Sequence, residues 1–475
     1  MSATRRKPVR LSACPLALAL LMGLLGALIV AAGRGDLWLD EIGSLQFTRK
    51  MHGVIDVFRL HHDNNHPLNT LFLFALRNTR SFMAFRLLSI LSGIGSLLLV
   101  TRFAWREWGR REALLAMVLT GTSFPLVLYF SEARGYAPAV FCALLAFAAL
   151  HANLNSFRWH RLLLFWAASV AGILAHMTFA IVAAALAAMQ LFDTIQSPGP
   201  RLRRMVAFLI HQAPPLFFIT AWYAYFTRFL VMGGGPVYGK PEVVLRASAY
   251  LLGFPDTPVG GLLALAFTLA VIGFGSFRMI RARNPLGVFF LCVGLLVPLV
   301  LFSVSTPTYF YFRHLLIGFP FFYLLLARLA VQCEALSPRN RTLVFAALAL
   351  FVAGQAPRVT RLLMKGRGGY SRALARIDRD SSSFMVSVGG DNDFRNRKLI
   401  EFYAPLVAKH TIIHYVPQSQ WPHTRPDWIV THSQDVSACP DPMVTSSQIG
   451  TYRLVEEFRF AGVSGWNWFL YRKRD

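Results

Sequence analysis

The chain has 475 residues, of which 55% are hydrophobic and only 15% are charged, and its mean hydropathy is +0.47. A soluble domain of this length could not bury so much apolar surface, so the composition indicates an integral membrane protein. The formal net charge of +25 does not call for nucleic-acid binding, because basic loops of a membrane protein lie against an anionic leaflet.

Apolar segments that could cross a bilayer recur along the chain. A membrane-spanning helix needs roughly 20 mostly apolar residues. Eleven candidates lie at residues 11–32, 83–101, 113–130, 138–152, 162–176, 178–192, 205–229, 258–277, 285–303, 314–331 and 342–356. The first could instead be a signal peptide, since Arg5, Arg6, Lys7 and Arg10 precede it and VAAG could be cleaved. Its length and the many later spans favour a membrane helix.

Arginines are concentrated in alternate connections between these segments. They lie at residues 102–111, 158–161, 201–204, 278–283 and 339–341, and the N-terminus is also basic. The positive-inside rule then places the N-terminus in the cytoplasm. An odd number of spans places the C-terminal part outside, so we expect a multi-pass protein of a bacterial inner membrane with a periplasmic C-terminal domain.

The first outer loop covers residues 33–82 and is the longest between spans. It begins with RGDLWLDEIGSL, in which Asp40 and Glu41 stand side by side just beyond the first span. Apolar residues then recur at helical spacing, which predicts an amphipathic helix on the membrane surface; they are Phe47, Met51, Val54, Ile55 and Phe58. Pro67 is suited to the first turn of a further helix.

Four later outer loops also carry polar residues. They contain YFSEARGYA, LAHMTF, the glycine- and proline-rich residues 231–258, and STPTYFYFRHLL. The glycines and prolines of residues 231–258 favour a mobile loop over a helix. The outer membrane face would thus gather Asp40, Glu41, His66, Glu132, Arg134, His176, Lys240 and Arg313.

Each of these residues has a simpler structural explanation when taken alone. Asp40 could be a solvated interfacial residue, Glu132 and Arg134 a local ion pair, and His176 a helix cap. Arg313 could extend its guanidinium to the membrane surface. Charges near a membrane are costly and tend to be functional, so their recurrence on one face favours a common site.

Residues 359–475 form a second region, in which polar residues return and no apolar segment is long enough to span. The pattern predicts strands at 384–388, 412–416, 427–431, 452–460 and 466–472 and a helix at 394–408. We therefore expect a transmembrane module over residues 1–358, followed by a small α/β domain outside the membrane. The five cysteines show no spacing typical of a disulfide framework or metal finger.

Five short motifs follow one another along the chain in this order: LWLDE, NHPL, SEARGYA, AHMTF and YFYFRHLLIGFP. This succession resembles that of the GT-C fold glycosyltransferases that use polyprenyl-phosphate sugars, a group that includes protein O-mannosyltransferases and the aminoarabinose transferase. The resemblance covers about residues 10–330. It implies a polytopic helical enzyme that transfers a sugar from a polyprenyl monophosphate to a hydroxyl of an extracytoplasmic lipid, glycan or protein.

The resemblance also implies roles for individual residues. Asp40 would be the catalytic base for an inverting displacement, in which a carboxylate takes the proton of the acceptor hydroxyl. Glu41 and Glu132 would assist in the catalytic site. Arg313 would hold the donor phosphate, with Arg134 and Lys240 as helpers.

Four residues would shape the substrate pocket, namely His66, Tyr136, His176 and Tyr311. The metal requirement is left open, because Glu41, His66, Glu132 and His176 could also supply ligands for a divalent ion.

Two alternative functions remain. A transporter or flippase would also have many spans, but it tends to place ionisable residues near the bilayer midplane in two related halves. A ligase or polymerase of lipid-linked polysaccharide would share the donor chemistry, and a diphosphate-linked oligosaccharide donor would distinguish it.

Overall fold

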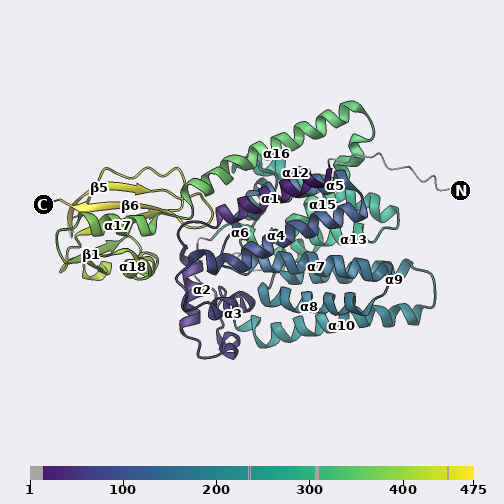
Figure 1. Cartoon of the computed structure of the whole chain (residues 1–475), viewed down its shortest axis with the longest axis horizontal. Helices are drawn as coiled ribbons and strands as arrows, with labels where there is room; N and C mark the ends of the chain where they lie inside the picture. The colour runs from purple at the N-terminus through teal and green to yellow at the C-terminus, as the bar shows by residue number, and fades with distance from the viewer. Residues whose placement is uncertain (1–13, 234, 236, 305–309, 447–448, 475) are drawn as a thin grey trace.

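The computed structural model describes residues 14–474 except 234, 236, 305–309 and 447–448. A bundle of long helices forms one part of the molecule, and a small domain with a sheet projects from one end of it (Figure 1). The basic residues before Cys14, including Arg5 and Arg10, lie outside the described residues.

Eight helical segments among the described residues are long and apolar enough to cross a membrane. They are formed by α4 (Phe82–Glu107), α7 (Tyr136–Asn155), α9 (Phe179–Gln196), α10 (Arg201–Tyr225) with η2 (Thr227–Phe229), α12 (Pro258–Arg281), α13 (Leu286–Leu291) with η3 (Cys292–Leu296) and α14 (Val297–Val304), η5 (Phe312–Gly318) with α15 (Phe319–Glu334), and α16 (Pro338–Lys365) with α17 (Tyr370–Asp380).

The remaining apolar segments are also helical. The helices α5 (Arg110–Thr122) and α6 (Phe124–Phe130) form a ninth candidate span bent by 66°. The helices α1 (Cys14–Ala32) and α8 (Trp159–Ala175) are apolar but shorter. Each of the eleven apolar segments predicted from the sequence therefore falls on a helix or a broken helix, which confirms the polytopic helical fold.

The bend between α5 and α6 is stabilised by polar groups from distant helices. Pro125 stands in the first turn of α6, and Ser123 before it is extended, so the helical hydrogen-bond ladder is interrupted. The freed backbone N–H of Phe124 donates to Gln355 Oε1 of α16 at 3.0 Å, and Tyr323 of α15 donates to Ser123 Oγ at 2.9 Å. Such partners are required because lipid offers none.

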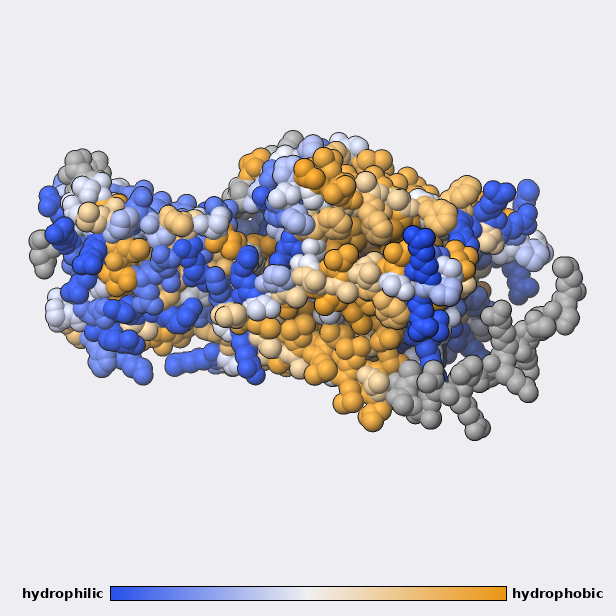
Figure 2. Space-filling model, turned by 90° about the horizontal axis from the view of Figure 1, so that it is seen from above, coloured by the Kyte–Doolittle hydropathy of each residue, from blue (hydrophilic) through white to orange (hydrophobic). Residues whose placement is uncertain are grey.

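Polar and apolar surfaces are separated along the molecule. Figure 2 shows a broad hydrophobic surface over the helical bundle, with hydrophilic residues on the C-terminal domain and at the opposite end. The connections α9–α10 and α15–α16 lie at that opposite end (Figure 1). These two Arg-rich connections therefore lie at the end of the bundle opposite the C-terminal domain.

The first outer loop folds into three short helices instead of one amphipathic helix. They are α2 (Leu39–Arg49), η1 (Val54–Arg59) and α3 (Pro67–Ala75). The single helix predicted over residues 47–58 is wrong, because Asp56 accepts hydrogen bonds from the backbone N–H groups of His52 and Gly53 at 2.8 and 3.0 Å. These bonds start a new turn. The prediction that Pro67 begins a helix is confirmed.

The prediction of a mobile loop over residues 231–258 is also incorrect in part. The helix α11 (Lys240–Leu252) begins just after the glycines and ends at Gly253, whose φ of 80° suits glycine. The inner side of α11 is apolar at helical spacing, with Val243, Ala247 and Leu251 all buried. Packing of this face outweighs the local turn signals.

The C-terminal domain contains α17, α18 (Asp393–Val407) and a six-stranded sheet in the order β2-β1-β3-β6-β5-β4. The strands are β1 (Met385–Gly390), β2 (Ile412–Tyr415), β3 (Trp428–Ser433), β4 (Met443–Ser446), β5 (Gly450–Phe458) and β6 (Asn467–Lys473). The strand β1 is parallel to β2 and β3, whereas β6 is antiparallel to both β3 and β5. All predicted elements are present, while α17 and β4 were not predicted.

Asp378 of α17 stabilises this domain through its carboxylate, which accepts hydrogen bonds from the backbone N–H groups of Lys409, His410 and Thr411. Burial raises the pKa of Asp378, but these bonds and that of the Thr411 hydroxyl lower it overall to about 2. The unfolded pKa is about 3.9, so the stabilisation is complete above that value and is lost as the pH falls through 2.

We therefore expect Asp378→Ala to destabilise the C-terminal domain at pH 7 by about 1–3 kcal/mol, because buried donors lose their acceptor. The difference from wild type should shrink between pH 4 and pH 2. Limited proteolysis of the C-terminal domain at a series of pH values measures this; an unchanged difference at pH 2 would contradict it.

Candidate active site

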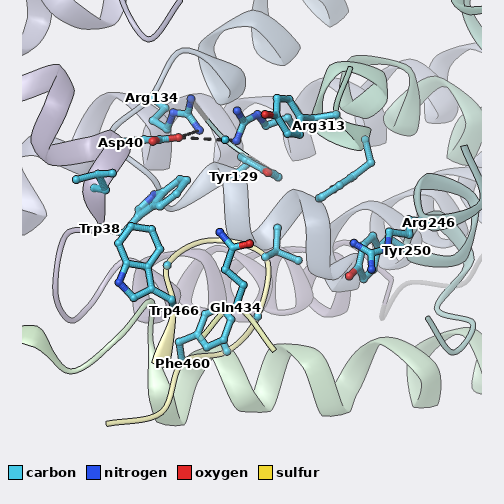
Figure 3. Close-up of a pocket in the computed structure, with 18 of the residues that line it drawn as sticks. Trp38, Asp40, Tyr129, Arg134, Arg246, Tyr250, Arg313, Gln434, Phe460 and Trp466 are labelled. Atoms are coloured by element: carbon cyan, nitrogen blue, oxygen red, sulfur yellow. Dashed lines mark ion pairs between the residues drawn. The ribbon is translucent and has the colours of Figure 1, made fainter. Parts of the chain in front are cut away.

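A carboxylate and two guanidinium groups from distant parts of the chain meet at the end of the bundle that adjoins the C-terminal domain. Asp40 lies in the first turn of α2, Arg134 in the connection between α6 and α7, and Arg313 in η5. Asp40 Oδ2 lies 3.0 Å from Arg134 Nη1 and 3.8 Å from Arg313 Nη1 (Figure 3). The Asp40 side chain is 26% exposed, whereas that of Arg134 is 4% exposed.

Glu41 lies beside Asp40 in sequence but points into the protein. It forms a bidentate ion pair with Arg86 of α4, with distances of 2.7 and 2.6 Å, and both side chains are fully buried. Its Oε1 also accepts the backbone N–H of Ala133 at 2.8 Å, and its Oε2 accepts that of Trp38 at 3.2 Å. Burial raises the pKa of Glu41, but the charge and hydrogen bonds of Arg86 lower it overall.

The Glu41–Arg86 pair links the segments that carry Asp40 and Arg134. Trp38 precedes Asp40, and Ala133 precedes Arg134, so one buried carboxylate fixes both neighbours. Asn64 adds a second link, because its amide donates to the Asp40 carbonyl at 2.7 Å and accepts from Arg134 Nη2 at 3.1 Å. Glu41 thus holds the backbone beside Asp40 and Arg134, and its side chain has no exposed surface from which to act in catalysis as predicted.

Glu41→Gln is expected to destabilise the protein by about 3–5 kcal/mol, because Arg86 would keep a buried charge without its partner. Replacing both residues with Met should cost less, since no buried charge then remains. Melting temperatures of the purified variants test this. A Glu41→Gln variant that is as stable as the double Met variant, or more stable, would contradict it.

Glu132 pairs with a residue outside its own loop. Its Oε1 accepts from Arg367 Nε at 3.2 Å, and both side chains are fully buried. The local Glu132–Arg134 pair considered from the sequence does not form, because Arg134 turns to Asp40 instead. Glu132 is therefore enclosed with Arg367, and its side chain has no exposed surface from which to contact a substrate.

Arg367 connects the membrane bundle to the C-terminal domain. It follows α16 and also donates to the carbonyls of Ala32, Leu128 and Ser131 at 3.0–3.1 Å. Close by, Ser371 donates to Asp36 through both its backbone N–H and its hydroxyl at 2.7 Å. These buried contacts hold the C-terminal domain against the first outer loop.

His66, Tyr136 and His176 form an aromatic cluster behind Arg134. The rings of His66 and His176 are 4.8 Å apart, those of Tyr136 and His176 are 4.4 Å apart, and the Arg134 guanidinium lies 4.9 Å from the Tyr136 ring. Burial lowers the pKa of His66 well below its usual value. All three side chains are at most 5% exposed. They therefore pack against Arg134 from the protein interior and do not face the solvent.

Gly135 allows this close packing. A Cβ at Gly135 would lie 1.9 Å from the Ala175 carbonyl oxygen and 2.8 Å from His66 Cβ. Only glycine fits there, and it lets the turn that carries Arg134 approach His66 and the end of α8.

Of the four residues that could have held a metal, only His66 and His176 are brought together. Glu41 binds Arg86 and Glu132 binds Arg367, whereas His66 and His176 pack against Tyr136. No group of three or more His, Cys, Asp or Glu residues suited to a metal ion is found in the described part of the chain. The predicted ligand set is thus not supported, because cations already neutralise both carboxylates.

Tyr311 contacts Arg313, whereas Lys240 is bonded elsewhere. The Arg313 guanidinium lies 4.4 Å from the Tyr311 ring, and Tyr311 lines the cavity described below. Lys240 instead donates to the carbonyl of Phe302 and does not line the cavity described below, whereas Arg246, one and a half turns further along α11, does.

A cavity of about 1310 Å³ opens beside Asp40 between the bundle and the C-terminal domain. Figure 3 shows Asp40, Arg134 and Arg313 at one end, Arg246 and Tyr250 at the other, and Gln434, Phe460 and Trp466 of the C-terminal domain along the wall between. The described lining has eight cationic residues and four acidic ones; the cations are Lys50, Arg134, Arg246, Arg313, Arg358, Arg361, Arg395 and Lys398.

The two arginines beside Asp40 have unused donors. The buried Nε atoms of Arg134 and Arg313 have no hydrogen-bond acceptor among the described residues. A buried guanidinium without acceptors is costly, and charged N–H groups bind phosphate strongly. The end of the cavity at Asp40 is therefore suited to an anionic ligand.

Comparisons with known proteins agree with this architecture. No protein-family model and no curated protein matches the chain. Among solved structures, ArnT from Cupriavidus metallidurans in the apo state is 15% identical, with a TM-score of 0.52, and the match covers 97% of this chain and 98% of that one. The likeness thus extends over the bundle and the C-terminal domain together. The chain has the GT-C fold.

Two further solved structures with the GT-C fold are similar at lower scores. ArnT from the same organism bound to undecaprenyl phosphate is 13% identical with a TM-score of 0.48, over 96% of this chain and 97% of that one. An oligosaccharyltransferase of Archaeoglobus fulgidus tethered with an acceptor peptide is 11% identical with a TM-score of 0.46, over 84% of this chain and 64% of that one.

Some residues of the site were missed by the sequence analysis. Arg86 lies inside a predicted span, where it could have been noticed because a charge within an apolar helix requires a partner. Asn64 lies in the polar run before Pro67 but has no distinctive spacing. Arg367 and Lys398 stand in polar surroundings, and no sequence signal distinguishes them from surface residues.

Proposed function

We propose that the protein is a membrane glycosyltransferase that moves a sugar from a polyprenyl monophosphate to a hydroxyl of an extracytoplasmic acceptor. The observation that carries this proposal is the Asp40 carboxylate held between Arg134 and Arg313, at the outer end of a GT-C fold bundle and on a large cationic cavity. A lipid-linked donor fits because its phosphate can reach the arginines while its tail stays in the membrane.

Asp40 acts as the base in this scheme. The acceptor hydroxyl attacks the anomeric carbon, its proton passes to a carboxylate oxygen of Asp40, and the bond from the anomeric carbon to the phosphate oxygen breaks. A single displacement of this kind inverts the anomeric configuration. Because both arginines contact Oδ2, Oδ1 is the oxygen better placed to take the proton.

Arg134 and Arg313 stabilise the leaving phosphate. The phosphate gains negative charge as the bond breaks, so fixed cations lower the barrier and no general acid is needed. Before the donor binds, Asp40 neutralises these cations. A bound phosphate would take over that role and leave the carboxylate free to accept a proton.

The proposed location is a bacterial inner membrane, with the N-terminus in the cytoplasm and the cavity facing the periplasm. The alternation of Arg-rich connections supports this orientation. The C-terminal domain would then be periplasmic, and its residues along the cavity wall would contact the acceptor.

The test supplies purified protein with labelled polyprenyl-monophosphate sugars, the matching diphosphate-linked oligosaccharides, and an extract of envelope acceptors. We expect label to move to an acceptor from a monophosphate donor. Consumption of the diphosphate donor alone would favour a polysaccharide ligase or polymerase. If neither donor is consumed while lipid crosses the bilayer of reconstituted vesicles, the protein is a flippase.

A further inference from the structure

A second, smaller cleft lies between α1 and α4, far from Asp40. Its volume is about 360 Å³, and it is lined by Met22 of α1 and by Leu98, Thr101, Arg102, Trp105 and Arg106 of α4. The residues of α4 lie on one face of the helix, since the other four follow Leu98 by three, four, seven and eight positions. They are in its second half, toward the Arg-rich connection to α5.

The surface of the cleft is almost entirely apolar, although two of the residues that line it are arginines. Leu98 is 51% exposed and Trp105 is 37% exposed, although both lie on a helix of the membrane bundle. Arg102 and Arg106 are exposed, and neither forms an ion pair or a side-chain hydrogen bond with the described residues. No acidic side chain is found among the described residues that line the cleft.

Two arginines four positions apart on a helix repel each other, so an anion between them would stabilise the pair. A tryptophan beside them is typical of the level of the lipid headgroups. Basic pockets between membrane helices on the cytoplasmic side bind anionic headgroups. We infer that this cleft binds an anionic phospholipid, with its phosphate at Arg102 and Arg106 and an acyl chain along Leu98 and Met22.

Charge argues against the other candidate occupant, the N-terminal segment. That segment carries Arg5, Arg6, Lys7 and Arg10 before α1, so it would add positive charge to a cleft that already has two cations. The lipid is thus the complementary ligand. This inference does not depend on the proposed function, because it concerns the opposite end of the bundle.

The experiment titrates the purified full-length protein with phosphatidylglycerol or phosphatidylcholine and counts bound lipids by native mass spectrometry. We expect phosphatidylglycerol to bind about tenfold more tightly. The double variant R102Q/R106Q should lose this preference. The control R201Q/R203Q removes the same charge from the exposed start of α10, which does not line this cleft, and should keep the preference for phosphatidylglycerol.

A third variant separates the cleft from its charge. Leu98→Trp fills the apolar part and leaves both arginines in place, so we expect it to weaken the binding of phosphatidylglycerol several-fold. Equal binding of the two lipids to wild type would overturn the inference. A preference that persists in R102Q/R106Q, or that is lost equally in R201Q/R203Q, would also overturn it.

Discussion

Replacing Asp40 with Asn is expected to slow sugar transfer by about 10²–10⁴-fold, the usual contribution of a general base. The amide has nearly the same shape, but it cannot accept the proton of the acceptor hydroxyl. Donor binding should persist, because Arg134 and Arg313 then lose the carboxylate that competes with the phosphate. The measurement is the initial rate of label transfer, together with donor affinity.

Asp256→Asn is the matched control for this variant. Asp256 lines the same cavity and pairs with Arg246 at 3.6 Å, but this end of the cavity is distant from Asp40 (Figure 3). It should retain most of the activity. Equal losses in the two variants, or an active Asp40→Asn, would remove Asp40 from its role as the base.

Arg313→Ala is expected to lower the rate by about 10²–10³-fold, as seen when a donor that stabilises transition-state charge is removed. Arg313 contacts Asp40 but is 21% exposed, so it can reach a ligand in the cavity. Arg313→Lys should recover part of the loss, because it keeps the charge without the planar fork. Lys240→Ala should have the smaller effect, since Lys240 does not line the cavity.

Donor affinity distinguishes this effect from a general loss of structure. A titration with unlabelled polyprenyl phosphate should show weaker binding to Arg313→Ala and unchanged binding to Arg59→Ala, which removes an arginine that is 79% exposed on the first outer loop. If Arg313→Ala binds the lipid phosphate as tightly as wild type does, the phosphate is held elsewhere.

The helical bundle could be predicted well from sequence because membrane spans have a strong and local signal. Each apolar segment is set by the thickness of the bilayer, so composition alone located α4, α7 or α12. The strands β1, β3 and β6 also followed local patterns. The helix α17 was missed because its first residues follow α16 after a very short break, and β4 because a four-residue edge strand has little pattern.

The outer loops were predicted less well, since their structure depends on contacts between distant segments. Asp56 begins a new helical turn through two hydrogen bonds, and nothing in the apolar spacing indicates this. The fold of α11 depends on the burial of Val243 and Ala247 against other helices. Such tertiary contacts override local turn signals.

The candidate site was only partly predictable for a related reason. The order of the motifs brought Asp40, Arg134 and Arg313 to one face, but it could not show which carboxylate each arginine would meet. The structure pairs Glu41 with Arg86 and Glu132 with Arg367, so two of the three acidic residues are buried supports. The ion-pair partner of each carboxylate depends on the direction of its side chain. Residues that are adjacent in sequence, such as Asp40 and Glu41, point in different directions.

The most direct test is an electron cryomicroscopy structure of the protein with a polyprenyl phosphate bound. We predict density for the phosphate within hydrogen-bonding distance of Arg134 and Arg313, beside Asp40, with the tail leaving toward the membrane. Phosphate density at Lys240, or at the far end of the cavity near Arg246 and Arg358, would contradict the proposed site.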